Sequence, residues 1–144
     1  MAENRTDAGS LERTYDSTLE SVDQAEELIL GFAGNAGFRE DDLHRIGMAV
    51  REAMVNAVVH GNRYNANKKV KFTATVEMDK LIVTIQDQGS GFDSNILPDP
   101  LAEENLLRQS GRGLLLIQAF VDEFQMGPGE GGGTEVRLVK NRTS

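Results

Sequence analysis

Several residue types are scarce or missing, and each absence excludes a class of protein. The chain has no cysteine, so disulfides and thiolate metal sites are excluded, and its two histidines argue against a histidine-rich metal cage. No apolar run approaches the roughly 20 residues that a membrane helix needs. The first seven residues have neither a basic start nor an apolar stretch, which predicts no secretory signal and a cytoplasmic location.

Positive charge is also in short supply. Fifteen Lys and Arg face 23 Asp and Glu, which gives a formal charge of −8. Binding of nucleic acid relies on Lys and Arg that displace counterions from the phosphate backbone, so DNA and RNA are poor partners for this chain. The lack of a long apolar run likewise predicts no membrane partner. Its 144 residues suit one domain, predicted over residues 11–144 after a polar, flexible tail at 1–10.

Hydrophobic periodicity predicts an α+β fold. The predicted elements are a strand at 11–18, a helix from 19 to about 32 ended by Gly31, Gly34 and Gly37, a helix at 41–62, a hairpin of strands at 69–78 and 81–85, a helix at 114–124 and a strand at 134–139. We expect a two-layer sandwich with the helices on one face of a mixed β-sheet. The polar stretch 93–110 is long for a plain connector, and a functional lid explains it.

Three polar residues on the second predicted helix form the first candidate site element. Glu52, Asn56 and His60 are spaced four apart, so they lie on one face, away from the apolar stripe. Ala49 and Ala53 flank that face and would allow a ligand to approach closely. A solvated face of an ordinary amphipathic helix is the alternative.

A second element follows a predicted strand and contains Asp87, Gly89 and Gly91. A buried aspartate there could accept a hydrogen bond from an amine such as that of adenine, and the glycines would let the backbone pass close to a ligand. A simple turn at the end of the strand is the alternative.

The third and fourth elements are rich in glycine. A helix opens at Gly111, Arg112, Gly113 and Leu114, where free N–H groups and a guanidinium favour binding of a phosphate. A plain helix cap with the same sequence pattern is the alternative. Gly133-Thr134 leads into the last strand and is a weaker signal.

The order and spacing of these four elements resemble the ATP-binding boxes of the Bergerat-fold superfamily, which includes gyrases, chaperones and histidine kinases. The similarity covers about residues 43–139, and the P-loop pattern GxxxxGK[ST] is absent. Within the superfamily, the stretch 52–62 and Asp99-Pro100-Leu101 followed by residues 111–114 look like the boxes of bacterial anti-sigma factor serine kinases.

The resemblance implies a role for each matching residue. It makes Asn56 a ligand of Mg²⁺ and Asp87 the acceptor of the adenine amine, with Gly89 and Gly91 shaping that pocket. It makes Gly111, Arg112, Gly113 and Leu114 the phosphate cradle of ATP and places Thr134 beside the adenine. Glu52 becomes the base that accepts the proton of the attacking hydroxyl. His60 gains no chemical step, and Asn62 is interpreted as part of the helix exit.

The function that this resemblance implies is a protein serine/threonine kinase dependent on ATP. Such a protein phosphorylates a Ser or Thr of an anti-anti-sigma antagonist of the STAS type and otherwise sequesters a sigma factor, usually as a homodimer. Two alternatives stay open: a non-catalytic ATP-binding interaction module, and a plain ATPase in which Glu52 orients water.

Overall fold

The computed structural model describes residues 5–7, 9–89 and 111–143. Its elements in chain order are β1 (Arg5–Asp7), β2 (Ser10–Asp16), α1 (Leu19–Asn35), α2 (Glu40–Val55), the π-helix η1 (Asn56–Gly61), β3 (Lys69–Glu77), β4 (Lys80–Gln86), α4 (Gly111–Phe120), β5 (Glu123–Pro128) and β6 (Thr134–Asn141). The predicted lid at 93–110 lies outside the described residues.

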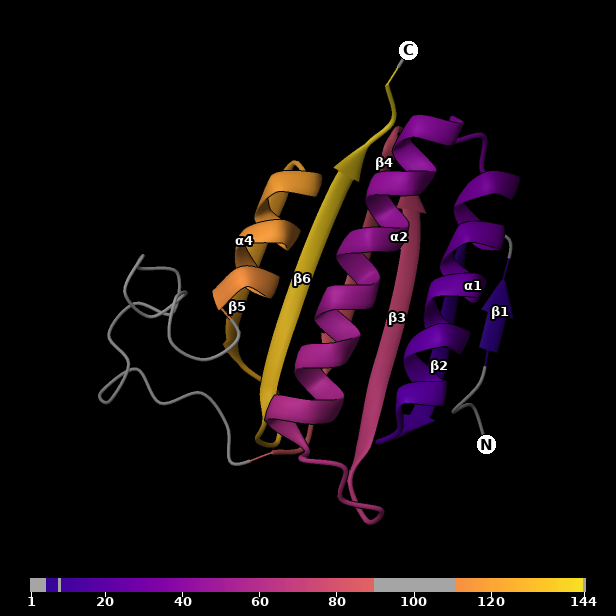
Figure 1. The fold of residues 1–144 in the computed structure, drawn as a ribbon. Coiled ribbons are helices and arrows are strands. Elements are labelled where there is room, and N and C mark those ends of the chain that lie inside the picture. Colours follow the sequence, from indigo (N-terminus) through magenta and orange to yellow (C-terminus); the bar gives the residue numbers. More distant parts are fainter. Residues whose placement is uncertain (1–4, 8, 90–110, 144) are drawn as a thin grey trace.

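The fold is a two-layer α+β sandwich, as predicted. The strands form one sheet in the order β1-β2-β3-β4-β6-β5, and α1, α2 and α4 cover a single face of it, with α2 in the middle (Figure 1). One detail of the prediction is wrong. The sheet is not mixed, because every strand pairing among the described residues is antiparallel.

Alternate side chains of the central strands build the core. Phe72 on β3 and Ile85 on β4 are opposite each other in the register and are fully buried under the helices. Helix α2 contributes Ile46, Val50 and Met54 to the same core, in agreement with the predicted apolar stripe. Because α2 packs against the sheet, α1 and α4, the core is wider than that stripe.

This wider core overturns the role expected for two alanines. Ala49 and Ala53 are 0% and 1% exposed and belong to the hydrophobic core, so they do not border a ligand. Small residues suit a helix that is packed on three sides. Gly47 shows the same constraint, since a β-carbon there would lie 3.1 Å from a methyl carbon of Leu30 on α1.

Local interactions and backbone conformation determine where α1 begins and ends. Thr18 caps the helix, because its hydroxyl oxygen accepts a hydrogen bond of 3.2 Å from the N–H of Ser21. The helix runs through Gly31 and Gly34, which were expected to end it. Gly37 alone of the three glycines has a positive φ, 92°, which turns the chain away after Ala36.

Two short strands were not predicted. Residues 5–7, assigned to the tail, pair with β2 as β1, so β2 is not an edge strand over that stretch.

The last predicted helix, at 114–124, is too long. The helix stops at Phe120, and Phe124 belongs to the second unpredicted strand, β5. The pairing of β5 with β6 could not be foreseen because β5 is short and its apolar side chains are few.

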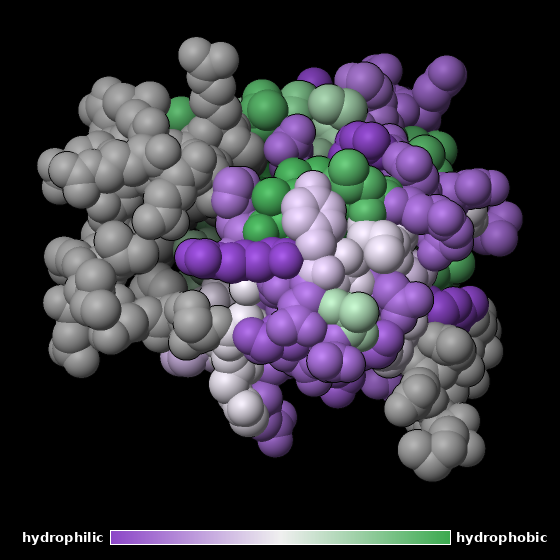
Figure 2. All heavy atoms as spheres, turned by 60° about the horizontal axis from the view of Figure 1, so that its bottom comes forward, coloured by the Kyte–Doolittle hydropathy of each residue, from purple (hydrophilic) through white to green (hydrophobic). Residues whose placement is uncertain are grey.

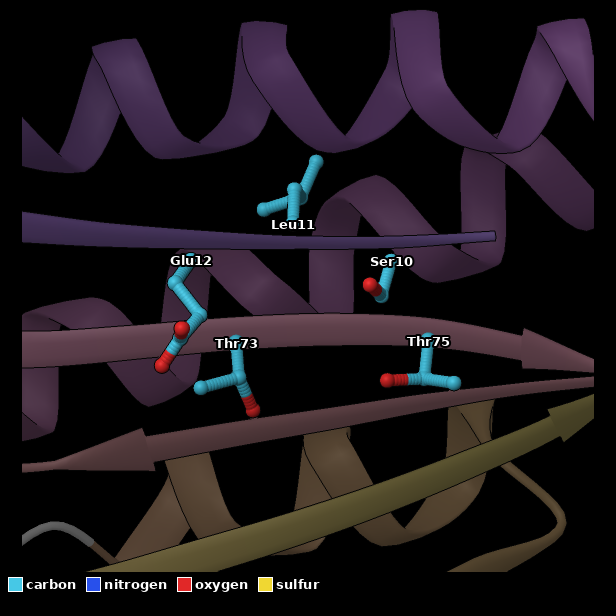
Figure 3. Close-up of a pocket in the computed structure, with 5 residues that line it drawn as sticks. All are labelled: Ser10, Leu11, Glu12, Thr73 and Thr75. Carbon is cyan, nitrogen blue, oxygen red and sulfur yellow. The ribbon is translucent and has the colours of Figure 1, made fainter. Parts of the chain in front are cut away.

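The face of the sheet away from the helices is polar. A shallow hollow on it is lined by Ser10, Glu12, Thr73 and Thr75 of β2 and β3, with Leu11 pointing the other way, toward the helices (Figure 3). Within the described residues, the helices are too short or too polar to cross a membrane.

Candidate nucleotide site

Asp87 is the centre of the candidate site. It follows the last residue of β4 and is only 6% exposed. Its Oδ1 accepts two backbone hydrogen bonds of 3.0 Å, one from the N–H of Gly89 and one from the N–H of Thr134. The backbone N–H of Asp87 in turn donates to the carbonyl of Thr134, so the exit of β4 and the start of β6 are tied together.

Three glycines crowd around this aspartate. A β-carbon at Gly61 would overlap Oδ2 of Asp87, and one at Gly133 would overlap its carbonyl oxygen. A β-carbon at Gly89 would overlap the carbonyl oxygen of Gly61. Gly133 also has a φ of 76°, which side chains disfavour. The glycines therefore bring the end of η1 and the strand ends to the carboxylate at distances that no other residue allows.

The two carboxylate oxygens are not equivalent. Oδ1 is saturated by its two backbone donors, whereas Oδ2 has no hydrogen-bond donor within the described part of the chain. Burial raises the pKa of Asp87, and the N–H groups of Gly89 and Thr134, with the charge of Lys68, only partly oppose that rise. A buried carboxylate with one unused oxygen is suited to accept a hydrogen bond from a ligand.

Asn56 is placed by a change of helix type. Helix α2 widens into the π-helix η1 at this residue, and π-turns inside α-helices are frequent at functional sites. The Nδ2 of Asn56 is buried and has no hydrogen-bond partner among the described residues. Buried amides are almost always paired, so this group has unused hydrogen-bonding capacity that a ligand could take up.

Glu52 lies one turn before Asn56 and is half-buried. No hydrogen bond or ion pair holds its carboxylate within the residues that the structure covers. His60 is exposed, in contrast. The wider turn of η1 contains more residues than an α-turn, which moves His60 out of line with Glu52 and Asn56.

The start of α4 points to the same end of the molecule. His44, near the start of α2, stacks edge-on against Phe120 at the end of α4 with ring centroids 6.4 Å apart, so the two helices run in opposite directions. The first turn of α4, residues 111–114, therefore faces the end where α2 finishes (Figure 1). The prediction that Gly111, Arg112, Gly113 and Leu114 open a helix is confirmed for the backbone.

The end of the molecule where α2 finishes is mostly hydrophilic, with apolar atoms showing in the middle of the view (Figure 2). Gly91, predicted to shape the adenine pocket, lies outside the described residues. No group of three or more His, Asp or Glu that could hold a metal ion occurs in the described ranges.

Sequence reasoning missed one residue of the site. Asn62 was interpreted as a helix exit, yet it is 2% exposed and its side chain joins three segments. It donates to Ser17 Oγ at 2.9 Å and to the Lys69 carbonyl at 3.0 Å, and it accepts from the N–H of Gln88 at 2.7 Å. An asparagine after a helix is usually a surface residue, so no signal in a single sequence marks it as buried.

Comparisons with known proteins agree with this geometry. The family described as "Histidine kinase-like ATPase domain" matches residues 15–140. The anti-sigma F factor of Bacillus subtilis is 33% identical over 103 residues, which cover 70% of each chain, and that of Clostridium beijerinckii is 28% identical over 102 residues, 69% of this chain and 71% of the relative.

A solved structure supports the fold. The crystal structure of the RsbU and RsbW domains of Rv1364c from Mycobacterium tuberculosis matches with a TM-score of 0.69 at 21% identity. The match covers 94% of this chain and 33% of that one, so the protein described here corresponds to about a third of it. Taken with the family match and the curated relatives, these findings show that the chain belongs to the histidine kinase-like ATPase domain family, in the group that includes the bacterial anti-sigma F factors.

Proposed function

We propose that this protein binds ATP with Mg²⁺ at the site around Asp87 and Asn56 and transfers the terminal phosphoryl group to a Ser or Thr of an anti-anti-sigma antagonist. The observation that carries the proposal is the pair of unsatisfied polar groups at one end of the fold. Nδ2 of Asn56 is buried without a partner, and Oδ2 of the buried residue Asp87 receives no hydrogen bond from the described residues. The chain has therefore prepared hydrogen-bonding groups for something it does not itself supply.

Each group suits one part of the nucleotide. Asp87 would accept a hydrogen bond from the exocyclic amine of adenine, while the backbone around Gly89 and Thr134 would form the wall of that pocket. Asn56 would hold the metal through its side-chain oxygen, because an amide binds a metal ion through its oxygen and not through its NH₂ group. Bound Mg²⁺ would supply charge neutralisation for the phosphates, and it typically takes few protein ligands, which agrees with the lack of an acidic cluster in the part of the chain that the structure describes.

Glu52 would act as the base. A half-buried carboxylate one turn from the metal ligand is placed to take the proton from the hydroxyl of the substrate as that oxygen bonds to phosphorus and ADP leaves. The first turn of α4, with Gly111, Arg112, Gly113 and Leu114, would hold the phosphates by its unpaired N–H groups.

The partners follow from the relatives. The curated relatives are named anti-sigma F factors, so we propose that this chain also sequesters a sigma factor when the antagonist is not engaged, and that it acts in the cytoplasm as a homodimer. The formal charge of −8 suits a basic partner surface.

The nucleotide site is tested by titrating the purified chain with a fluorescent ATP analogue, with and without Mg²⁺. We expect saturable binding that needs Mg²⁺, a loss of at least about tenfold in affinity for Asp87→Asn, and loss of the Mg²⁺ effect for Asn56→Ala. Affinity that is unchanged in the Asn56 variant would contradict the site.

The transfer step is tested with ATP labelled at the terminal phosphate and a purified STAS-type antagonist. Label in the antagonist, lost in Glu52→Gln although nucleotide still binds, supports the kinase. Label released as free phosphate identifies a plain ATPase. Nucleotide binding with neither product, together with capture of a sigma factor, identifies a non-catalytic module.

A further inference from the structure

Asn62 connects the end of the π-helix to the adenine side of the site. Its side-chain amide lies at the junction of four segments: the turn after β2, the end of η1, the first residue of β3 and the exit of β4. Ser17, its partner after β2, is itself 3% exposed and donates its hydroxyl to the Lys68 carbonyl at 2.5 Å. The amide is therefore held from both sides in a dry environment.

The hydrogen bonds fix which way the amide points. The Lys69 carbonyl can only accept, so it must face the NH₂ group, and the N–H of Gln88 can only donate, so it must face the oxygen. Reversal of the amide would lose both bonds. Aspartate or leucine, which have similar shapes, cannot make this set of contacts.

The hydrogen bond between Asn62 and Gln88 holds the peptide group next to Asp87, the residue proposed to recognise adenine. Gln88 directly follows Asp87, and its N–H is fixed at 2.7 Å from Asn62 Oδ1. On the other side, Asp87 is fixed by its backbone N–H to Thr134. With both flanking peptide groups held and Oδ1 bound by the N–H groups of Gly89 and Thr134, the carboxylate is fixed with Oδ2 beside Gly61.

We propose that Asn62 is a positioning residue that sets the selectivity of the site for adenine by holding the Asp87-Gln88 peptide in place. This inference rests on the proposed function, because it takes Asp87 as the group that meets the base. An adenine presents an amine that a fixed carboxylate can accept from, whereas guanine presents a carbonyl oxygen at the same position, which the carboxylate repels. An Asp87 carboxylate that was free to move would distinguish adenine from guanine less well.

The test compares Asn62→Ala with Ser17→Ala in the full chain. Ser17→Ala removes one partner of the amide on the side away from Asp87, and Asn62→Ala removes the bond to Gln88 as well. The measurement is the ratio of affinities for ATP and GTP, by displacement of a fluorescent adenine nucleotide, at a temperature where circular dichroism shows both variants folded.

We expect wild type and Ser17→Ala to prefer ATP strongly, and Asn62→Ala to lose about tenfold of that preference. A general loss of stability would lower both affinities together and would leave the ratio intact. An unchanged ratio in Asn62→Ala, with normal selectivity in wild type, overturns the inference and leaves the proposed function standing. No nucleotide binding by wild type overturns both.

A second measurement serves if Asn62→Ala does not fold. The exchange rate of the Gln88 amide hydrogen can be followed by NMR in the wild-type chain without nucleotide. Protection comparable to that of the interior of β4 supports a peptide held in advance of binding, and rapid exchange overturns it.

Discussion

The two ends of α2 lie in opposite kinds of environment. At its start, Asp42 and Lys140 are buried with side chains 2% and 6% exposed, and they form an ion pair of 3.3 Å that is joined by Asp122. At its end, Asn56 and Asp87 each keep an unused polar atom in the described structure. The buried ion pair at the first end is satisfied by the protein itself, although Nε of Arg142 there is also buried without a partner, and the groups at the second end keep capacity for a ligand.

The contacts around the two ends also differ, although each end contains a non-glycine residue with a positive φ, which at the first end is Met78 with 55°. Near the start of α2, the C-terminal residues are clamped. The N–H and hydroxyl of Thr143 both donate to Asp42, and Arg142 lies over the ring of Phe38, 5.1 Å from its centroid. At the other end, η1 is followed by Arg63 and Tyr64 with φ values of 52° and 59°, which non-glycine residues avoid. The comparison teaches that stability is concentrated at one end and binding capacity at the other.

The largest expected effect is at the satisfied end. Asp42→Ala would leave the buried Lys140 with Asp122 as its one carboxylate partner in the described structure and the Thr143 donors without Asp42, so we expect a loss of about 3–5 kcal/mol in the free energy of unfolding. Urea denaturation measures it. Asp41→Ala, at an exposed neighbour in the same helical turn, is the control and should change stability by less than about 0.5 kcal/mol.

That ion pair also predicts a dependence on pH. Burial acts to raise the pKa of Asp42, but hydrogen bonds from Thr143 and Lys140 outweigh it, and the pKa is lowered. The stabilisation is therefore present above the ordinary carboxylate range and is lost as pH falls through the lowered pKa. Equal acid sensitivity of wild type and Asp42→Asn would contradict this account.

The next effect is at the binding end. In Gly61→Ala the new methyl group would overlap the Asp87 carboxylate, so we expect about 1–3 kcal/mol of destabilisation together with loss of nucleotide affinity. Gly31→Ala is the matched control, because no atom lies within 4 Å of its β-carbon and a helix interior favours alanine by about 0.5–1 kcal/mol. Normal ATP binding by Gly61→Ala would refute the close approach.

A smaller expected effect is a dependence of nucleotide affinity on pH, caused by the raised pKa of Asp87. Because burial raises the pKa of Asp87, its contribution to stability is complete below the unfolded pKa and is lost as pH rises through the folded one. Nucleotide binding needs the ionised form, so affinity should fall on acidification before ordinary carboxylates titrate. Affinity measured from neutral to mildly acidic pH should decline in wild type and remain flat in Asp87→Asn.

The smallest effect is relief of backbone strain. Arg63→Gly removes the cost of a left-handed residue, about 1–2 kcal/mol, and adds a flexible glycine to the unfolded chain, so stability should change by less than about 1 kcal/mol. Arg63→Val should be clearly destabilising by comparison, because a β-branched residue tolerates this conformation least. Thermal unfolding distinguishes the two; equal midpoints would show that the turn carries no strain.

Much of the architecture could be predicted from the sequence because it depends on local patterns. Alternation in 69–78 and 81–85 located β3 and β4, and the apolar stripe of residues 41–62 located α2 and most of its core side chains. The short strands β1 and β5 were not predicted, because they are held by pairing with a neighbouring strand and have no clear hydrophobic alternation of their own. Ala49 and Ala53 were misplaced because a stripe does not reveal how many neighbours a helix has.

The sequence by itself determined the order of the longer elements and the positions of the candidate site residues along them: Glu52 and Asn56 on one helix, Asp87 after a strand, and glycines where the chain must pass closely. Only the tertiary structure decided the rest. It showed that a π-turn sets Asn56 apart from His60, that Gly61 and Gly133 press against Asp87, and that Asn62 is buried. These features arise from contacts between segments far apart in the chain, and local residue patterns carry no record of such contacts.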